Sequence, residues 1–412
     1  SDNTAIGYAS LSANITGTRN VASGFRALQF NTTANDNTAT GYYALYANTT
    51  GASNVAVGSY ALNANTTASN STAVGYQALT ANTTGATNTA FGKGALLANT
   101  TGNTNVAVGA NALAANVDGD KSVAVGVDAL AAQDPASNVD MYNVAVGDSA
   151  GAAVTTGLQN TLIGGLAGDA LTDADNNTAV GYLALSTNIL GSANTAIGVD
   201  SLSTSNPSSA ALTYNTAVGF HSGKAVTTGF QNTFVGGLAG DSTDDGAGNA
   251  AVGYGALSSN CGGYNAAFGW QSLAATTGTL NCAYGSGSGL AVTSGDNNIF
   301  LGTDSGRTGS PGGNITTADN ILSIGNQNIA TANIQVDWTV ASDARDKTDF
   351  TALDLGLDFV KALAPVTYKW DKRANYGDKY AEDYDLNAQT PDGTHKEDWL
   401  DIGFKAQEVE AL

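Results

Sequence analysis

Histidine and cysteine, the side chains that most often bind metals or act as nucleophiles, are scarce in this chain. The two histidines, His221 and His395, lie far apart in the sequence and in no ligand motif, so no metal site is expected at either. Cys261 and Cys282 are expected to be small buried or half-buried thiols, with a disulfide between them as the alternative. The sequence therefore predicts no metal centre and no cofactor.

Acidic side chains are more frequent, but their spacing does not form a catalytic pattern. The acidic stretches at 118–121, 172–177 and 242–248 could offer oxygen ligands to Ca²⁺, yet none matches a complete calcium motif, so solvated loops are expected. Residues 1–340 contain no Glu, and their Asp residues fall in expected loops. Cleavage of a glycosidic bond usually needs a pair of carboxylates. The sequence thus argues against a glycan-cutting enzyme.

Charge is unevenly distributed along the 412 residues, whose net charge is −20. Residues 1–340 hold six basic residues, whereas residues 341–412 hold the other nine together with all four Glu. This change in composition predicts a domain boundary near residue 340. The acidic balance argues against a nucleic-acid partner, which requires clustered Lys and Arg. There is no apolar run of about 18 residues, so no membrane insertion is expected.

A repeat of seventeen residues dominates residues 1–302. Alignment on one glycine gives eighteen repeats, whose steps are all seventeen residues except two of twenty-one and two of sixteen. Ala or Ser always follows the anchor glycine by three residues, and Ala precedes it by two in fifteen repeats. Four residues after the anchor stands Leu in twelve repeats and Gly in six. The anchors are Gly7, Gly24, Gly41, Gly58, Gly75, Gly92, Gly109, Gly126, Gly147, Gly164, Gly181, Gly198, Gly219, Gly236, Gly253, Gly269, Gly285 and Gly302.

Seventeen residues are too few for a helical repeat but enough for one coil of a β-solenoid, with two or three short strands joined by turns. The "TAVG" and "ALxAN" stretches are expected to be strands, and "NTTGAT" a turn. Stacked coils would align Asn3, Asn20, Asn37 and Asn54 in a ladder in which each side-chain amide bonds the next, about 4.8 Å away. Eighteen coils would give a rod of roughly 85 Å.

The predicted interior is thin, because its invariant position is Ala or Ser. One Leu and one Val per coil would hardly offset the entropy of ordering it. We therefore expect several chains to associate side by side, with Leu79 and its equivalents in a buried seam between them. Regular Thr rows would also suit an ice-binding solenoid, but the "NTTG" threonines are expected in turns, which leaves this as a remote alternative.

Two insertions interrupt the repeat, one before Gly147 and one before Gly219. Loops on rigid scaffolds often carry function. Tyr142 and Tyr214 occupy matching places in these insertions, and aromatic rings suit the faces of sugars. They are the candidate receptor-binding residues, and a plain surface bulge is the simpler alternative.

The repeats resemble two known groups of proteins. Segments such as "NTAVGYLAL" and "NVAVGANAL" are similar to head repeats of trimeric autotransporter adhesins, and more so to phage tail-fibre proteins with "NTAxGYxAL…NTTG" units. The resemblance covers roughly residues 1–302 and implies a homotrimeric parallel β-roll.

The tail carries a second resemblance, on "SDARDK", "LAPVTYKW" and "GFKAQEVE" in that order. These segments resemble the C-terminal intramolecular chaperone of endosialidase tail spikes, which helps three chains trimerise and then cuts itself off. The resemblance implies a Ser–Lys dyad that maps onto Ser342 and Lys347 and cleaves the Ala341–Ser342 bond. The family domain continues into long helices beyond the last of these motifs, whereas this sequence stops at Leu412.

Together these observations predict a mainly β protein. It would comprise a β-solenoid shaft at 1–302, a β-rich neck at 303–340 and the N-terminal part of a mixed α/β chaperone and autoprotease domain at 341–412. The expected function is that of a homotrimeric viral tail fibre in the virion, which contacts other tail proteins and a host surface glycan or protein receptor. The alternative is a trimeric adhesin on a bacterial cell surface.

Overall fold

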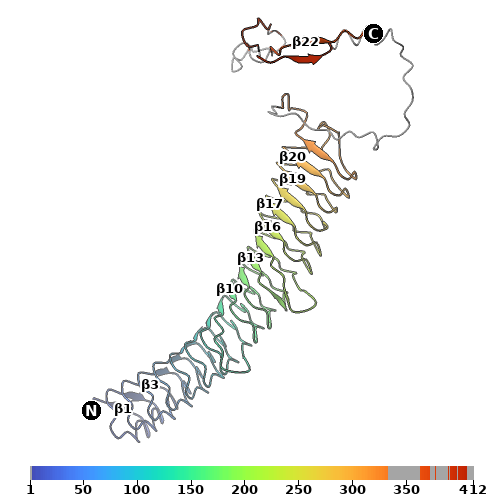
Figure 1. Cartoon of the computed structure of the whole chain (residues 1–412). Coiled ribbons are helices and arrows are strands. Elements are labelled where there is room, and N and C mark those ends of the chain that lie inside the picture. Colours follow the sequence, from blue (N-terminus) through green and yellow to red (C-terminus); the bar gives the residue numbers. More distant parts are fainter. Residues whose placement is uncertain are drawn as a thin grey trace. The chain divides into compact units, whose positions relative to one another are not determined.

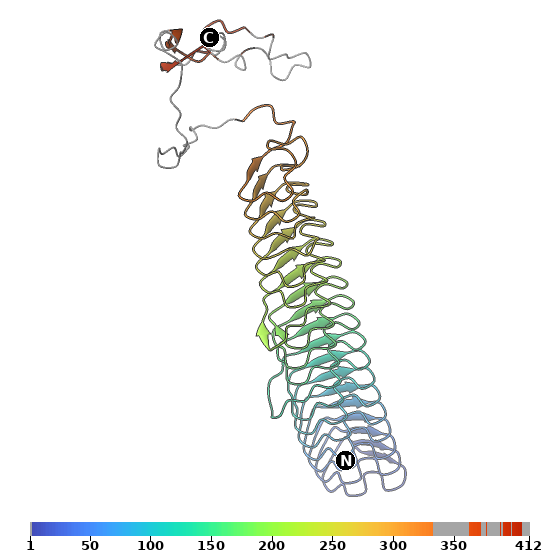
Figure 2. The same cartoon turned by 90° about the vertical axis from the view of Figure 1, so that its right-hand side faces the viewer.

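The computed structural model describes residues 2–332, 362–371, 376, 388, 390–396 and 398–405. The chain divides into two compact units, residues 1–332 and residues 333–412. The first unit is a parallel β-solenoid, as the repeat predicts, and its coils stack along a gently bent shaft (Figures 1 and 2).

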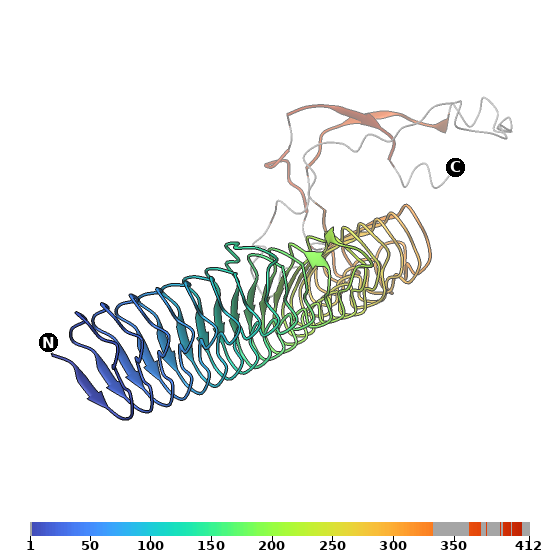
Figure 3. The same ribbon diagram turned by 90° about the horizontal axis from the view of Figure 1, so that it is seen from below.

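One sheet of nineteen parallel strands runs the length of the shaft, with one strand per coil (Figures 1 and 3). Neighbouring strands pair in register, so that Ala73 of one coil lies beside Ala90 of the next. The strands are β1 (Thr4–Ile6), β2 (Val21–Ser23), β3 (Thr38–Thr40), β4 (Val55–Val57), β5 (Thr72–Val74), β6 (Thr89–Phe91), β7 (Val106–Val108), β8 (Val123–Val125), β9 (Val144–Val146), β10 (Thr161–Ile163), β11 (Thr178–Val180), β13 (Thr195–Ile197), β15 (Thr216–Val218), β16 (Thr233–Val235), β17 (Ala250–Val252), β18 (Ala266–Phe268), β19 (Cys282–Tyr284), β20 (Ile299–Leu301) and β21 (Leu322–Ile324).

The prediction of a second strand at "ALxAN" is wrong, because these residues form turns. Leu79 within such a stretch has a positive φ of 51°, as does Gln77 (58°) just before it, and this conformation cannot continue a strand. The turns are nevertheless bonded to both neighbouring coils: the Gln77 N–H donates to the Ser59 carbonyl of the preceding coil, and the Leu79 N–H donates to the Ala95 carbonyl of the following one. Backbone hydrogen bonding therefore continues outside the sheet.

The anchor glycine is required by the closeness of the coils. Gly181 has a φ of +137°, and a Cβ placed on it would lie 2.5 Å from the carbonyl oxygen of Gly198 in the next coil. Any L side chain would both strain the backbone and collide with a neighbouring main chain. The spacing of these glycines thus corresponds to the number of residues in one coil, because each anchor glycine packs against the anchor glycine of the next coil.

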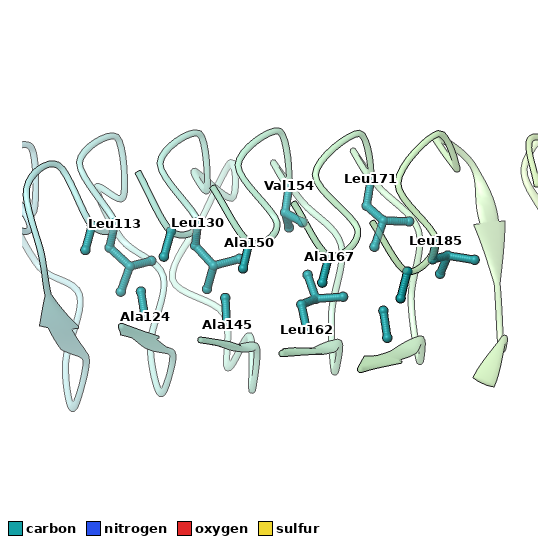
Figure 4. Packing of buried hydrophobic residues seen from close by; sticks show 14 of the residues in the cluster. Leu113, Ala124, Leu130, Ala145, Ala150, Val154, Leu162, Ala167, Leu171 and Leu185 are labelled. Carbon is teal, nitrogen blue, oxygen red and sulfur yellow. The ribbon is translucent and has the colours of Figure 1, made fainter. Parts of the chain in front are cut away.

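The core lies inside each single chain, which overturns the prediction of a Leu seam between chains. Leu79 is fully buried among residues of its own shaft, as are the Ala residues at the centre of most strands. Figure 4 shows its equivalents Leu113 and Leu130 together with Ala124 and Ala145. Val74 and its equivalents, expected to share that core, are the third residues of their strands and face outward. The central residue of a strand points to the opposite side from its two neighbours, so only one side chain per strand can enter the narrow coil.

The two repeat types place their large core side chain on different walls of the coil. In the Leu type it lies in the turn after the anchor glycine, and in the Gly type a large residue lies at the centre of a strand. Phe234 replaces the usual Ala at the centre of β16, and Gly223 and Gly240 lie on either side of its ring. A Cβ on Gly240 would be 2.5 Å from Phe234 Cε1. Leu162 and Phe300 stand between glycine pairs in the same way, and Figure 4 shows Leu162 among the buried residues. Each such residue fills space that two Leu side chains occupy elsewhere.

Two ladders of buried Asn run along the shaft. In the predicted one, the links differ from expectation: Asn20 Oδ1 accepts the backbone N–H of Asn37 at 3.0 Å, and Asn20 Nδ2 donates to the Ala34 carbonyl at 2.9 Å. Amide-to-amide bonding occurs in the other ladder, where Asn82 Nδ2 donates to Asn65 Oδ1 at 2.9 Å. These bonds satisfy polar groups in the interior, where an unpaired one would be costly.

The described part of the second unit contains one pair of antiparallel strands, β22 (Val366–Tyr368) and β23 (Asp401–Gly403). β22 lies within the "LAPVTYKW" segment.

Candidate functional site

The two insertions form different structures on the same side of the coil. In the first, Asp120 and Asp140 form an isolated parallel bridge. In the second, β12 (Gly191–Ser192) pairs with β14 (Ala211–Leu212), which appears as a small separate sheet beside the shaft (Figure 2). Both insertions end on a tyrosine with positive φ, five residues before an anchor glycine.

Tyr142 is 49 % exposed and is held by charged neighbours. Its hydroxyl lies 3.2 Å from Lys121 Nζ and 3.2 Å from Asp140 Oδ2, while Lys121 Nζ donates to Asp140 Oδ2 at 2.7 Å and lies 5.2 Å from the centre of the ring. The hydrogen bond from Lys121 lowers the pKa of the Asp140 carboxyl, and the same bond raises the pKa of Lys121. The ring is therefore fixed in position, as a binding platform needs.

Tyr214 is 52 % exposed and lies in the same row as Tyr142, four coils further along the shaft. The two rings do not form one site. At about 4.8 Å per coil they are about 19 Å apart. A ligand touching both would have to extend along the shaft.

Seven aromatic rings cluster in the first four coils, a feature that sequence reasoning missed. The Tyr43 ring lies 4.7 Å from that of Tyr46 and is stacked on that of Tyr60, with centroids 5.8 Å apart. Arg26 lies over two of the rings, and its Nη1 donates to the Tyr43 hydroxyl at 3.1 Å. The sequence signal was the presence of aromatic residues one, two, five or six positions after the anchor glycine in these coils. The members are Tyr8, Phe25, Phe30, Tyr42, Tyr43, Tyr46 and Tyr60.

His221 belongs to a small surface ion cluster. Its Nε2 lies 3.1 Å from Asp200 Oδ2, which also accepts a hydrogen bond from Lys224 Nζ at 3.2 Å. Nearby, Asp241 has one carboxyl oxygen that is buried without a hydrogen-bond partner, and burial raises the pKa of this side chain. Asp169, which occupies the same repeat position four coils earlier, shows the same features.

Neither cysteine forms a disulfide. Cys261 is buried, with its Sγ 3.3 Å from Thr243 Oγ1, and Cys282 is half-buried on the outward side of β19; burial raises the pKa of both thiols. The prediction of two free thiols is confirmed. Within the described residues, no group of three or more His, Cys, Asp or Glu side chains could hold a metal ion.

The outward side of the main sheet carries two uncharged rows, which we call the outer strip. It consists of the first and third residues of each of the nineteen strands. Among the third residues, seventeen are apolar, and several are well exposed, such as Phe91 (56 %) and Ile163 (39 %). The outer strip contains no Asp, Glu, Lys, Arg or His.

In the second unit, β22 and β23 bring together two segments that are far apart in sequence. Thr367 of "LAPVTYKW" lies opposite Ile402, and Gly403 of "GFKAQEVE" lies opposite Val366. The predicted cleavage residues Ser342 and Lys347, and the bond after Ala341, lie outside the described residues.

A comparison with known families gives one match in this unit. Residues 342–412 match the family described as chaperone of endosialidase. This match and the β-solenoid shaft fit a phage tail fibre with an endosialidase-type chaperone domain. Such a domain on a solenoid rod suggests a trimeric fibre protein, and the two paired motifs of β22 and β23 lie within the matched segment.

No curated protein and no solved structure matches the chain significantly. A search of the described residues found no helix that is both long and apolar enough to cross a membrane.

Proposed function

We propose that the chain is a structural and receptor-binding segment of a homotrimeric phage tail fibre, which works outside the host cell as part of the virion. The observation that carries this proposal is the match of residues 342–412 to the chaperone of endosialidase family at the end of a long β-solenoid. A solenoid held by coil-to-coil hydrogen bonds gives length and stiffness from a short repeated sequence.

Attachment would use groups that project from the shaft, to a glycan or protein on the host surface. Tyr142, held by Lys121 and Asp140, and Tyr214 are the candidates, since exposed rings can stack on sugar faces. A substitution of both tyrosines by Ala should reduce binding of the labelled chain to host cells, whereas Thr156→Ala, on an exposed turn, should not. Equal binding by all three proteins would exclude the tyrosines as receptor contacts.

Location in the particle can be tested directly. Antibodies against this chain should label the tail of an intact phage in electron micrographs. Label on the surface of bacterial cells, with none on particles, would instead support the trimeric adhesin.

We further propose that this chain, when it carries a complete C-terminal chaperone domain, cuts itself between Ala341 and Ser342. Serine is a weak nucleophile at neutral pH and needs a base. Lys347 is five residues away, and a desolvated lysine can lose its proton near neutral pH, so its burial on trimer assembly would couple cleavage to correct folding. Asp343 and Asp346 would oppose this unless their carboxylates turn away or pair with Arg345.

Denaturing gels of the protein with a complete chaperone domain, and of its Ser342→Ala and Lys347→Ala variants, test this proposal. The unsubstituted protein should release a fragment that begins at residue 342, and both variants should remain intact. Release of the same fragment by both variants would exclude the dyad.

A further inference from the structure

We propose that the outer strip is the surface on which three copies of this chain meet, parallel and in register, around a common axis. This inference rests on the proposed trimer and adds which face of the shaft the copies share. It also replaces the predicted Leu seam, because the Leu row is already buried within each chain.

The absence of charge is the first argument. Around a three-fold axis each residue near the axis meets its own two copies. A charged residue there would place three like charges together in a desolvated setting, which is strongly unfavourable. Across nineteen strands, neither row of the outer strip contains an ionisable acid or base other than the thiol of Cys282 and the phenol of Tyr284.

The charges of the shaft lie on other parts of the coil. Asp36 pairs with Arg19, and Asp140 pairs with Lys121, in both cases on the turn side just before a strand. Asp118 and Asp134 also lie outside the strands. The outward face of the sheet is thus free of charge in an acidic protein.

Exposed apolar side chains supply the second argument. Val57, Phe91, Val146, Ile163, Ile197 and Val252 are each more than a third exposed, and all are third residues of their strands. A continuous apolar patch of this length is rare on the free surface of a protein and marks an interface. The coil interior is complete without these side chains, so a single chain leaves them unused.

The available area is sufficient for association. Nineteen strands at about 4.8 Å spacing give a strip about 86 Å long, and three residues make it about 10 Å wide. Each chain would bury about 860 Å² against its two neighbours together, so the trimer would bury about 2,600 Å² in total, above the roughly 1,600 Å² of a standard two-protein interface. A strip that repeats every coil also fits a second copy in parallel register, since each apolar row then faces the same row.

Cysteine cross-linking with a short bis-maleimide tests this assignment on the full chain. In a Cys282→Ser background, Ile163→Cys places one thiol on the outer strip, and Thr156→Cys places one on an exposed turn of the same coil. Ile163→Cys should give linked chains on denaturing gels, and Thr156→Cys should give single chains. The unmodified protein carries its own probe, because Cys282 lies on the outer strip of β19 and should cross-link as well.

Light scattering of the same samples separates the two proposals. If the particles have three times the chain mass but Ile163→Cys does not cross-link, or Thr156→Cys links equally well, the outer strip is not the interface while the trimer stands. If the unmodified chain is a folded monomer, the proposed trimer and this inference both fail.

Discussion

Each strand of the shaft has an inner and an outer side, and the two differ in composition. The inner side is a single Ala in most coils, packed against a fully buried Leu such as Leu79. The outer side offers two residues, rich in Val, Thr, Ile and aromatic rings, and much of it remains exposed. This contrast teaches that the hydrophobic strand pattern has two purposes. The small residue closes the coil, and the larger residues are available for contacts between chains.

The largest expected effect comes from a charge on the inner side. Leu79→Asp should cost several kcal/mol, because it buries an unpaired carboxylate. Hydrogen exchange should report faster opening of that coil and its neighbours. Val74→Asp, on the outer strip of the same coil, should leave exchange within the coil nearly unchanged and weaken association instead. The inner and outer assignment would be reversed if Val74→Asp opened the coil and Leu79→Asp did not.

The exchange of volume between repeat types gives the next largest effect. Phe234→Ala should cost about 3–5 kcal/mol, because it leaves a cavity between two glycines. Gly240→Leu alone should also destabilise, since its Cβ would meet the Phe234 ring. The triple variant Phe234→Ala, Gly223→Leu, Gly240→Leu recreates the Leu type of coil. It should recover most of the free energy of unfolding that the single changes lose. Additive losses in denaturant melts would contradict the explanation of the two repeat types.

The amide ladder should contribute less. Asn82→Ala removes the donor to Asn65 Oδ1 and the acceptor for Asn99 Nδ2. We expect it to lower the free energy of unfolding by about 1–3 kcal/mol. Thr84→Ala, on the exposed turn beside it, is the matched control and should be nearly neutral. A loss no larger than that of the control would show that the ladder bonds have no net effect on stability.

The smallest effect concerns Asp241, whose pKa is raised by burial. A carboxyl with a raised folded-state pKa favours folding when protonated, and this contribution is lost as the pH rises through that pKa. Asp241→Asn should therefore raise the melting temperature at pH 7, with the gain shrinking toward pH 4. Asp245→Asn removes the same charge from an exposed loop and should show no such dependence; equal gains in both variants would point to net charge instead.

The β-solenoid and its seventeen-residue coil could be predicted from sequence, because glycine spacing and turn residues are local signals that every repeat restates. The direction of Leu79 could not, since a leucine with positive φ is uncommon and its periodicity resembles that of a strand residue. The linkage of the Asn ladders was missed for a related reason. Asn20 Oδ1 accepts from a backbone N–H rather than from the side-chain amide of the next Asn. Which of the two donors it meets depends on how far each turn is shifted along the shaft axis relative to the next coil.

For the candidate sites, the sequence located the insertions and their tyrosines but not what holds them. The contact of Tyr142 with Lys121 joins residues twenty-one positions apart, across the longer step between two coils. The aromatic cluster around Tyr43 could be predicted only by assuming that equivalent positions of neighbouring coils lie side by side, as Tyr43 and Tyr60 do. Ser342 and Lys347 remain predictions, because they lie outside the described residues.

The central claim is that the shaft works as three chains sharing their outer strips. The most direct test is the mass of the purified chain at micromolar concentration, measured by light scattering coupled to chromatography. The account predicts three times the 41.2 kDa chain mass, together with bis-maleimide cross-linking of Cys282 between chains. A stable, folded particle of 41.2 kDa in which Cys282 does not cross-link would contradict it.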